Sequence, residues 1–115
     1  MSQANDLSVR IEDSPEAPQV SLRGEVDLRT SPALRTQLLE LVGRKPKRLI
    51  VDLSHVEYMD SSGVGTLVEI KRHTDRKSVR MVLVNPQARV RSLFEITRLE
   101  KFFLIASTID EALTL

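Results

Sequence analysis

The sequence predicts a single α/β domain spanning residues 1–115, with a mixed, mostly parallel sheet of four to five strands and about four helices. Three observations support this fold class. The length of 115 residues suits one domain. Two short runs near the start alternate apolar and polar residues, as half-buried strands do. Continuous apolar runs then alternate with helical patterns, which indicates parallel strands joined by crossover helices. The predicted element order is ββαβαβαβα.

The first third of the chain predicts two antiparallel strands and a helix. Residues 7–11 and 20–23 carry the alternating pattern, the prolines of residues 12–18 indicate a turn, and Gly24 is expected to end the second strand. Thr30 or Ser31 can cap a helix whose first turn contains a proline. Leucines then recur at near-helical spacing, and Gly43 is expected to stop that helix.

The remaining elements alternate between strand and helix. Apolar runs predict buried strands, and apolar residues at helical spacing predict the helices between them. Strands are expected at residues 48–53, 79–84 and 103–105, and helices at residues 61–73, 86–96 and 108–113. Residues 1–6 are expected to be a flexible N-terminus. No repeat, low-complexity tract or long linker divides the chain.

The composition excludes several functional classes. Cysteine is absent, so there is no disulfide framework, thiolate metal site or cysteine nucleophile. Only 3% of residues are aromatic, and the core is therefore expected to be aliphatic. No run of 18 apolar residues predicts a membrane span, and the N-terminus lacks the features of a signal peptide. We therefore expect a cytoplasmic protein that does not bind membranes.

The charge is nearly balanced overall but unevenly distributed. A net charge of +1 argues against general nucleic-acid binding. Residues 1–43 hold 4 basic and 7 acidic side chains, a net of −3, whereas residues 44–115 hold 13 and 9, a net of +4. The clearest basic cluster is the run of residues 44–48. It is interpreted either as a patch for an acidic partner or, given Gly43 and Pro46, as a solvated loop between two elements.

The candidate functional site is the loop between the strand at residues 48–53 and the next helix. It carries Asp60, Ser61, Ser62 and Gly63. Loops that follow the carboxyl ends of parallel strands are where open α/β sheets bind ligands and partners. The helix start has free N–H groups and a dipole that favour negative charge, so the fold would tolerate a phosphate on either serine. The same residues are equally those of a helix cap: Asp60 as N-cap, serines in the first turn and a glycine that permits close packing.

Other chemistry at this loop is poorly supported. A serine hydrolase elbow requires Gly-x-Ser-x-Gly and a histidine partner, and the Asp60-Ser61-Ser62-Gly63 segment does not fit that pattern. A P-loop pattern is absent. His55 and the nearby aspartates have no recognised metal-ligand spacing, so no metal and no catalytic residue is expected.

In this context the sequence resembles the STAS-domain anti-sigma factor antagonists, or anti-anti-sigma factors. The resemblance rests on the Asp60-Ser61-Ser62-Gly63 segment after its strand, on residues 22–30, on residues 84–94 and on the closing residues 110–113. It covers nearly the whole chain from about residue 7. A lone Asp-Ser-Ser-Gly would be a weak signal, but the combination in this order is specific.

The resemblance implies a mechanism. Unphosphorylated antagonists of this family bind an anti-sigma factor that is also an ATP-dependent serine kinase, and so free a sigma factor. The kinase phosphorylates the first serine after the aspartate, here Ser61, and a serine phosphatase removes the phosphate. Asp27 matches an acidic position of the family's partner surface. The implied partner-binding set is Asp27, Thr30, Asp60, Ser61, Ser62 and Gly63.

The resemblance also implies what the chain does not do. ATP and magnesium would be bound by the kinase, so no cofactor is expected here, and the chain would be a substrate and a binding module rather than an enzyme. We expect a monomer or a weak dimer that makes no direct contact with nucleic acid. The alternative function is a STAS binding module of a transporter or of another signalling complex. A competing acceptor is Ser62, whose hydroxyl is chemically equivalent to that of Ser61.

Overall fold

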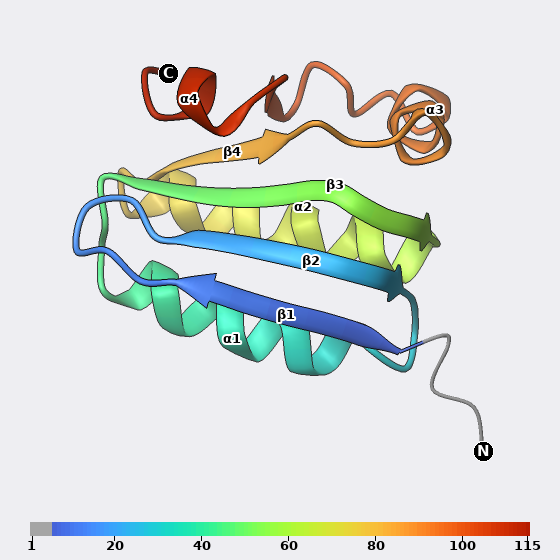
Figure 1. Cartoon of the computed structure of the whole chain (residues 1–115), viewed down its shortest axis with the longest axis horizontal. Helices are drawn as coiled ribbons and strands as arrows, with labels where there is room; N and C mark the ends of the chain where they lie inside the picture. Colours follow the sequence, from blue (N-terminus) through green and yellow to red (C-terminus); the bar gives the residue numbers. More distant parts are fainter. Residues whose placement is uncertain (1–5) are drawn as a thin grey trace.

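A computed structural model describes residues 6–115, and its elements follow the predicted order ββαβαβαβα (Figure 1). The strands are β1 Leu7–Glu12, β2 Gln19–Val26, β3 Arg48–Met59, β4 Arg80–Val84 and β5 Leu104–Ala106. The helices are α1 Ser31–Gly43, α2 Ser61–Arg76, α3 Ala88–Ile96 and α4 Ile109–Ala112. The predicted flexible N-terminus lies outside the described residues, except for Asp6, which pairs with Arg29 at 3.5 Å.

The strands lie in the sheet in sequence order, from β1 at one edge to β5 at the other. The pair β1–β2 is antiparallel, and the pairs β2–β3, β3–β4 and β4–β5 are parallel. This confirms the mixed, mostly parallel sheet. Because β2, β3 and β4 run in the same direction, the loops that follow them meet at one end of the sheet, at the right of Figure 1. The predicted functional loop is one of these.

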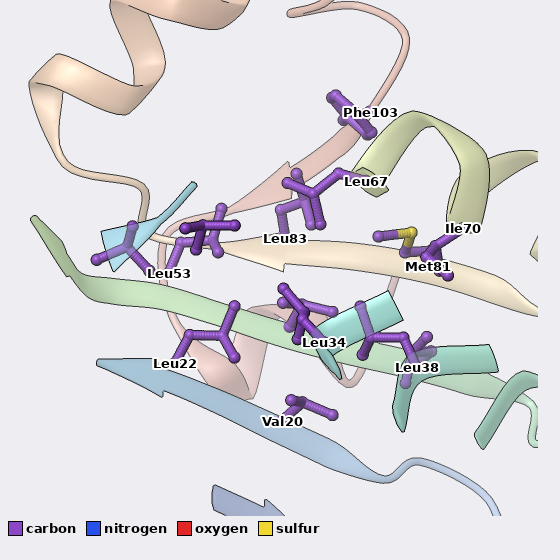
Figure 2. Close-up of a cluster of buried hydrophobic side chains, with 14 of the residues drawn as sticks. Val20, Leu22, Leu34, Leu38, Leu53, Leu67, Ile70, Met81, Leu83 and Phe103 are labelled. Atoms are coloured by element: carbon purple, nitrogen blue, oxygen red, sulfur yellow. The ribbon is translucent and has the colours of Figure 1, made fainter. Parts of the chain in front are cut away.

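Apolar clusters cover both faces of the sheet. Alternate residues of the strands pack against α1, α2 and α3 on one face, whereas α4 covers a smaller apolar cluster formed by Ile50, Val82, Val84 and Ala106. Figure 2 shows leucines of α1 and α2 directed toward the strand side chains. Its labelled residues are Val20, Leu22, Leu34, Leu38, Leu53, Leu67, Ile70, Met81, Leu83 and Phe103. Each fully buried leucine of this kind stabilises the fold by about 1.5–3 kcal/mol.

One predicted boundary was wrong for an instructive reason. Gly24 does not end the second strand, which continues to Val26. Gly24 has φ +116°, and a Cβ there would lie 2.2 Å from the carbonyl oxygen of Asp6. The register against β3 also shifts on both sides of this position. Glycine therefore allows an irregularity and a close approach of β1 while the strand continues.

Three other elements differ from the prediction by two or more residues at one end. Strand β3 extends past residue 53 to Met59, because Val56 and Met59 are buried beyond its continuous apolar run. Helix α2 extends past His73 to Arg76, with Thr74 buried in its last turn. Helix α3 begins at Ala88 rather than at residue 86, because its N-cap Gln87 keeps an extended backbone.

Candidate functional site

Asp60 joins the end of β3 to the start of α2 and caps that helix. Its backbone is extended, at φ −110° and ψ −171°. Its Oδ1 accepts hydrogen bonds from the backbone N–H of Ser62 at 3.0 Å and of Gly63 at 3.2 Å. These donors have no partner within the helix, so the carboxylate satisfies two of the N–H groups that a helix start leaves free. The predicted N-cap role is confirmed.

The two serines of the motif have different environments. The Ser62 side chain is half-buried, and its hydroxyl donates to Asp60 Oδ1 at 2.6 Å. The same hydroxyl lies 3.4 Å from the hydroxyl of Ser31. Ser61 is exposed, and within residues 6–115 no protein group hydrogen-bonds its hydroxyl. Access to an incoming protein therefore favours Ser61 over Ser62, a distinction that the sequence alone did not provide.

Gly63 permits the close packing of α2 on the sheet. A Cβ at this position would lie 2.7 Å from Met59 Cγ, 2.8 Å from Val26 Cγ1 and 2.9 Å from the Val26 carbonyl oxygen. These contacts are shorter than side chains tolerate, and one of them is with backbone. The glycine therefore brings the first turn of α2 against the end of β2.

Asp27 organises the neighbouring loop, between β2 and α1. Its Oδ1 accepts from the backbone N–H of Arg29 at 2.9 Å and of Thr30 at 3.2 Å, and its Oδ2 accepts from the Arg29 guanidinium at 3.2 Å. The Thr30 hydroxyl accepts from the Asp27 N–H at 3.0 Å and donates to the Glu25 carbonyl oxygen at 2.9 Å. Thr30 thus occupies the N-cap position of α1, but its hydroxyl holds this loop rather than the helix N–H groups.

The electrostatic state of Asp27 follows from these contacts. Partial burial by itself raises the pKa of Asp27, but the N–H donors of Thr30 and Arg29 and the Arg29 guanidinium stabilise the carboxylate more strongly. The resulting pKa of Asp27 lies below its ordinary value. Asp27 is therefore a carboxylate at neutral pH, on the loop that adjoins the serines.

The predicted site residues lie on two adjoining loops. The Asp60 N–H donates to the Val26 carbonyl oxygen at 3.2 Å, which joins the end of β3 to the end of β2. Ser31 and Ser62 approach each other across the two helix starts, and Gly63 packs on Val26. The structure thus brings Asp27 and Thr30 on one loop beside the Asp60–Gly63 loop.

Sequence reasoning missed two residues of this region. Ser31 donates from its hydroxyl to the Asp27 carbonyl oxygen at 2.7 Å and contacts Ser62. Leu28 is 76% exposed in the middle of the loop that Asp27 organises. Asp27 and Thr30 are both residue types that form turns, and an apolar residue between them indicates an exposed side chain. This pattern could have identified Leu28 from the sequence.

In the described part of the chain, no group of three or more histidine or acidic residues is arranged to hold a metal ion. Nor does any helix among residues 6–115 combine the length and apolarity needed to cross a bilayer.

The fold and the site together define a small α/β module that presents a capped pair of serines at the carboxyl edge of its sheet. The STAS domain family model matches residues 8–112, and the chain belongs to the STAS family. The predicted fold and family are thereby confirmed.

Individual relatives are similar over almost the whole chain. The anti-sigma-F factor antagonist RsfB of Mycobacterium tuberculosis is 32% identical over 114 residues, covering 99% of this chain and 93% of RsfB. A crystal structure of an anti-sigma factor antagonist from Mycobacterium paratuberculosis is 30% identical, with a TM-score of 0.87, and covers 99% of this chain and 97% of that one. The structure of the antagonist SpoIIAA in its unphosphorylated form is 25% identical, with a TM-score of 0.81 and 92% of each chain covered.

Proposed function

We propose that this protein is an anti-sigma factor antagonist whose binding to its partner is switched off by phosphorylation of Ser61. The observation that carries the proposal is the contrast between the exposed Ser61 and the hydrogen-bonded Ser62 at the capped start of α2. Support comes from the similarity of nearly the full chain to anti-sigma factor antagonists, among them SpoIIAA, whose structure has been determined in its unphosphorylated form.

The partner in this proposal is an anti-sigma factor that also acts as a serine kinase, and a serine phosphatase reverses its action. ATP and magnesium are bound by the kinase, and the antagonist contributes the acceptor hydroxyl. It acts as a substrate and a binding protein rather than as an enzyme. Because sigma factors direct transcription, which takes place in the cytoplasm, a protein in this role acts in the cytoplasm.

The physical basis of the switch is local charge. A phosphate on Ser61 adds about −1.5 to −2 charge units at neutral pH. It would sit beside the Asp60 carboxylate, and the adjoining loop carries the Asp27 carboxylate, which is paired with Arg29. A partner surface that accommodates the neutral hydroxyl would then face an unpaired dianion, which costs affinity. The helix dipole and the first-turn N–H groups favour the phosphate, so the fold is retained while binding is lost.

The experiment uses the full chain with a candidate anti-sigma factor kinase encoded in the same genome. The two proteins are incubated with ATP and Mg²⁺, and the phosphate is mapped by mass spectrometry. We expect modification at Ser61, loss of modification in Ser61→Ala, and retained modification in Ser62→Ala. Phosphate found only on Ser62 would overturn the assignment of the acceptor.

Binding is then measured by calorimetry with the same kinase. Ser61→Ala should bind as the unmodified protein does, whereas Ser61→Asp should bind at least about tenfold more weakly because of the added charge. Ser92→Asp is the matched control, since Ser92 is an exposed serine on α3. Equal affinities for the Ser61→Asp and Ser92→Asp variants would contradict the charge switch.

A further inference from the structure

Two neighbouring hollows lie at the end of the sheet opposite Ser61. The larger, of about 700 Å³, lies between the last turns of α2, the start of β4 and the segment that leads into β5. The smaller, of about 220 Å³, is lined by the start of β3, the start of β4 and Leu115. Ser78 and Arg80 line both, so the two hollows form one surface, which we call the basic groove. Its cationic residues are Lys47, Arg48, Lys71, Arg80 and Lys101.

The basic groove carries a strong local excess of positive charge on a chain whose overall charge is +1. Asp75 is the one acidic side chain in its lining, and Lys71 Nζ binds the two oxygens of that carboxylate at 2.7 and 2.9 Å. Within the described residues, no carboxylate lies within ion-pairing distance of Lys47, Arg80 or Lys101. These cations are therefore available to an external anion.

The structure divides the basic run of residues 44–48 into two parts. Arg44 is neutralised by Asp13 at 2.8 Å and by Glu40 at 3.8 Å. Lys47 and Arg48 line the groove, where Arg48 Nε donates to the Leu115 carbonyl oxygen at 2.7 Å, so that within residues 6–115 Lys47 is the cation of this run without a partner there. The Lys47 carbonyl oxygen accepts a hydrogen bond of 3.0 Å from the Arg80 N–H. The pairing of β3 with β4 thus places Arg80 beside Lys47 and Arg48.

The lining of the larger hollow is also apolar. Buried Val79, Met81 and Phe103 contribute to it, as does Leu104, which is 40% exposed. Lys71 Nζ lies 5.4 Å from the centre of the Phe102 ring, on the same wall. An occupant that matches this surface combines negative charge with apolar side chains.

We propose that the basic groove docks an acidic segment of a partner protein, one that carries apolar side chains between its carboxylates. A protein segment fits better than a nucleic acid, because the two rings of the groove, Phe102 and Phe103, pack against each other at 5.1 Å. Bases stack instead on exposed aromatic rings. Lys71 is ten residues along α2 from Ser61, about 15 Å at 1.5 Å per residue. We therefore expect docking to be independent of the phosphorylation state of Ser61, because exposed charges at this separation are largely screened.

The probe is a fluorescent peptide of sequence Glu-Asp-Leu-Glu-Glu-Leu-Asp-Glu. Titration of this peptide with the full chain should show saturable binding by fluorescence. In an NMR titration of the ¹⁵N-labelled full chain with the peptide, we expect amide shifts centred on Arg80, Met81 and Lys101. Raising the salt from about 50 mM to about 300 mM should weaken binding severalfold, because screening reduces the attraction between exposed charges. A peptide in which serine replaces both leucines should bind more weakly.

The double variant Arg80→Glu, Lys101→Glu should lose at least about tenfold in affinity for the peptide. The matched control is Arg89→Glu, Arg91→Glu, which reverses two exposed arginines on α3 and should change affinity less than about twofold. Ser61→Asp should leave peptide affinity unchanged. If the double variant unfolds, Lys101→Gln alone makes the same comparison.

Three results would overturn the proposal. One is peptide binding that the groove variants do not weaken. Another is that oligothymidine or phosphatidylglycerol vesicles bind more tightly than the peptide does and that the groove variants lose this binding. That result would assign the groove to a nucleic acid or a membrane. The third is loss of peptide binding in Ser61→Asp. None of these results bears on the acceptor serine, whose phosphorylation by the kinase is measured separately.

Discussion

The Ser62 hydroxyl donates a 2.6 Å hydrogen bond to Oδ1 of Asp60, the same oxygen that accepts the backbone N–H groups of Ser62 and Gly63. One carboxylate oxygen therefore both caps α2 and holds the second serine of the motif. The first serine extends from the same turn into solvent. Two chemically equivalent hydroxyls are made unequal by a single capping residue.

Replacing Asp60 tests this double role. Asp60→Ala should lower the free energy of unfolding by about 0.5–2 kcal/mol, because the first-turn N–H groups lose their acceptor. Asp60→Asn should retain most of that stability, since asparagine caps about as well. Urea unfolding of both variants provides the measurement. In Asp60→Ala the Ser62 hydroxyl is also released, and a kinase specific for this loop should then modify Ser62 to a detectable extent. Equal losses of stability in the two variants would show that capping is not the cause.

The two glycines of α2 make a matched pair. Gly63→Ala should destabilise the fold by about 1–3 kcal/mol, because the added methyl meets Met59 and both the side chain and the backbone of Val26. Gly65→Ala meets nothing within 4 Å and should stabilise the protein by about 0.5–1 kcal/mol through helix propensity. Thermal and urea unfolding should show opposite signs for the two variants. The same sign for both would contradict the packing described for Gly63.

The low pKa of Asp27 predicts a pH dependence. Its folded-state pKa is depressed, so its contribution to stability is present above the unfolded pKa, about 3.9, and is lost as the pH falls through the folded value. Asp27→Asn should therefore show a smaller loss of stability on acidification below about pH 4 than the parent. A carboxyl NMR titration should place the Asp27 pKa below its ordinary value and show it rising in Arg29→Ala. An unchanged titration in that variant would mean that the guanidinium contributes nothing.

The sequence was sufficient for the order of the elements and for the cap. Both depend on local signals: the alternation in β1, the apolar runs of the parallel strands, and an aspartate three residues before a glycine at a helix start. The continuation of β2 through Gly24 was not predictable in this way. It depends on the close approach of Asp6 and on the shifted register against β3, which are properties of the assembled sheet.

The candidate site was likewise predictable only in part from the sequence. The motif identified Asp60, Ser61, Ser62 and Gly63, but the difference between the serines required the side-chain geometry. Ser31 came to the site because its helix start packs beside that of α2, which no local pattern of residues 27–31 reveals. Lys47 and Arg80 are far apart in sequence, and only the β3–β4 pairing brings them into one groove.

Leu28 provides the sharpest test of the proposed partner surface. It is 76% exposed, on a loop that hydrogen bonds of Asp27 and Thr30 hold in place, so little conformational freedom would be lost when a partner covers it. Full burial of this leucine by a partner would contribute about 1.5–3 kcal/mol to binding. Leu28→Asp should weaken binding to the anti-sigma factor by about tenfold or more while changing the free energy of unfolding by less than about 0.5 kcal/mol. Leu113→Asp, at the end of α4, is the control and should leave affinity unchanged. Equal affinities for the Leu28→Asp variant and the parent would place the partner elsewhere, even if Ser61 proved to be the phosphate acceptor.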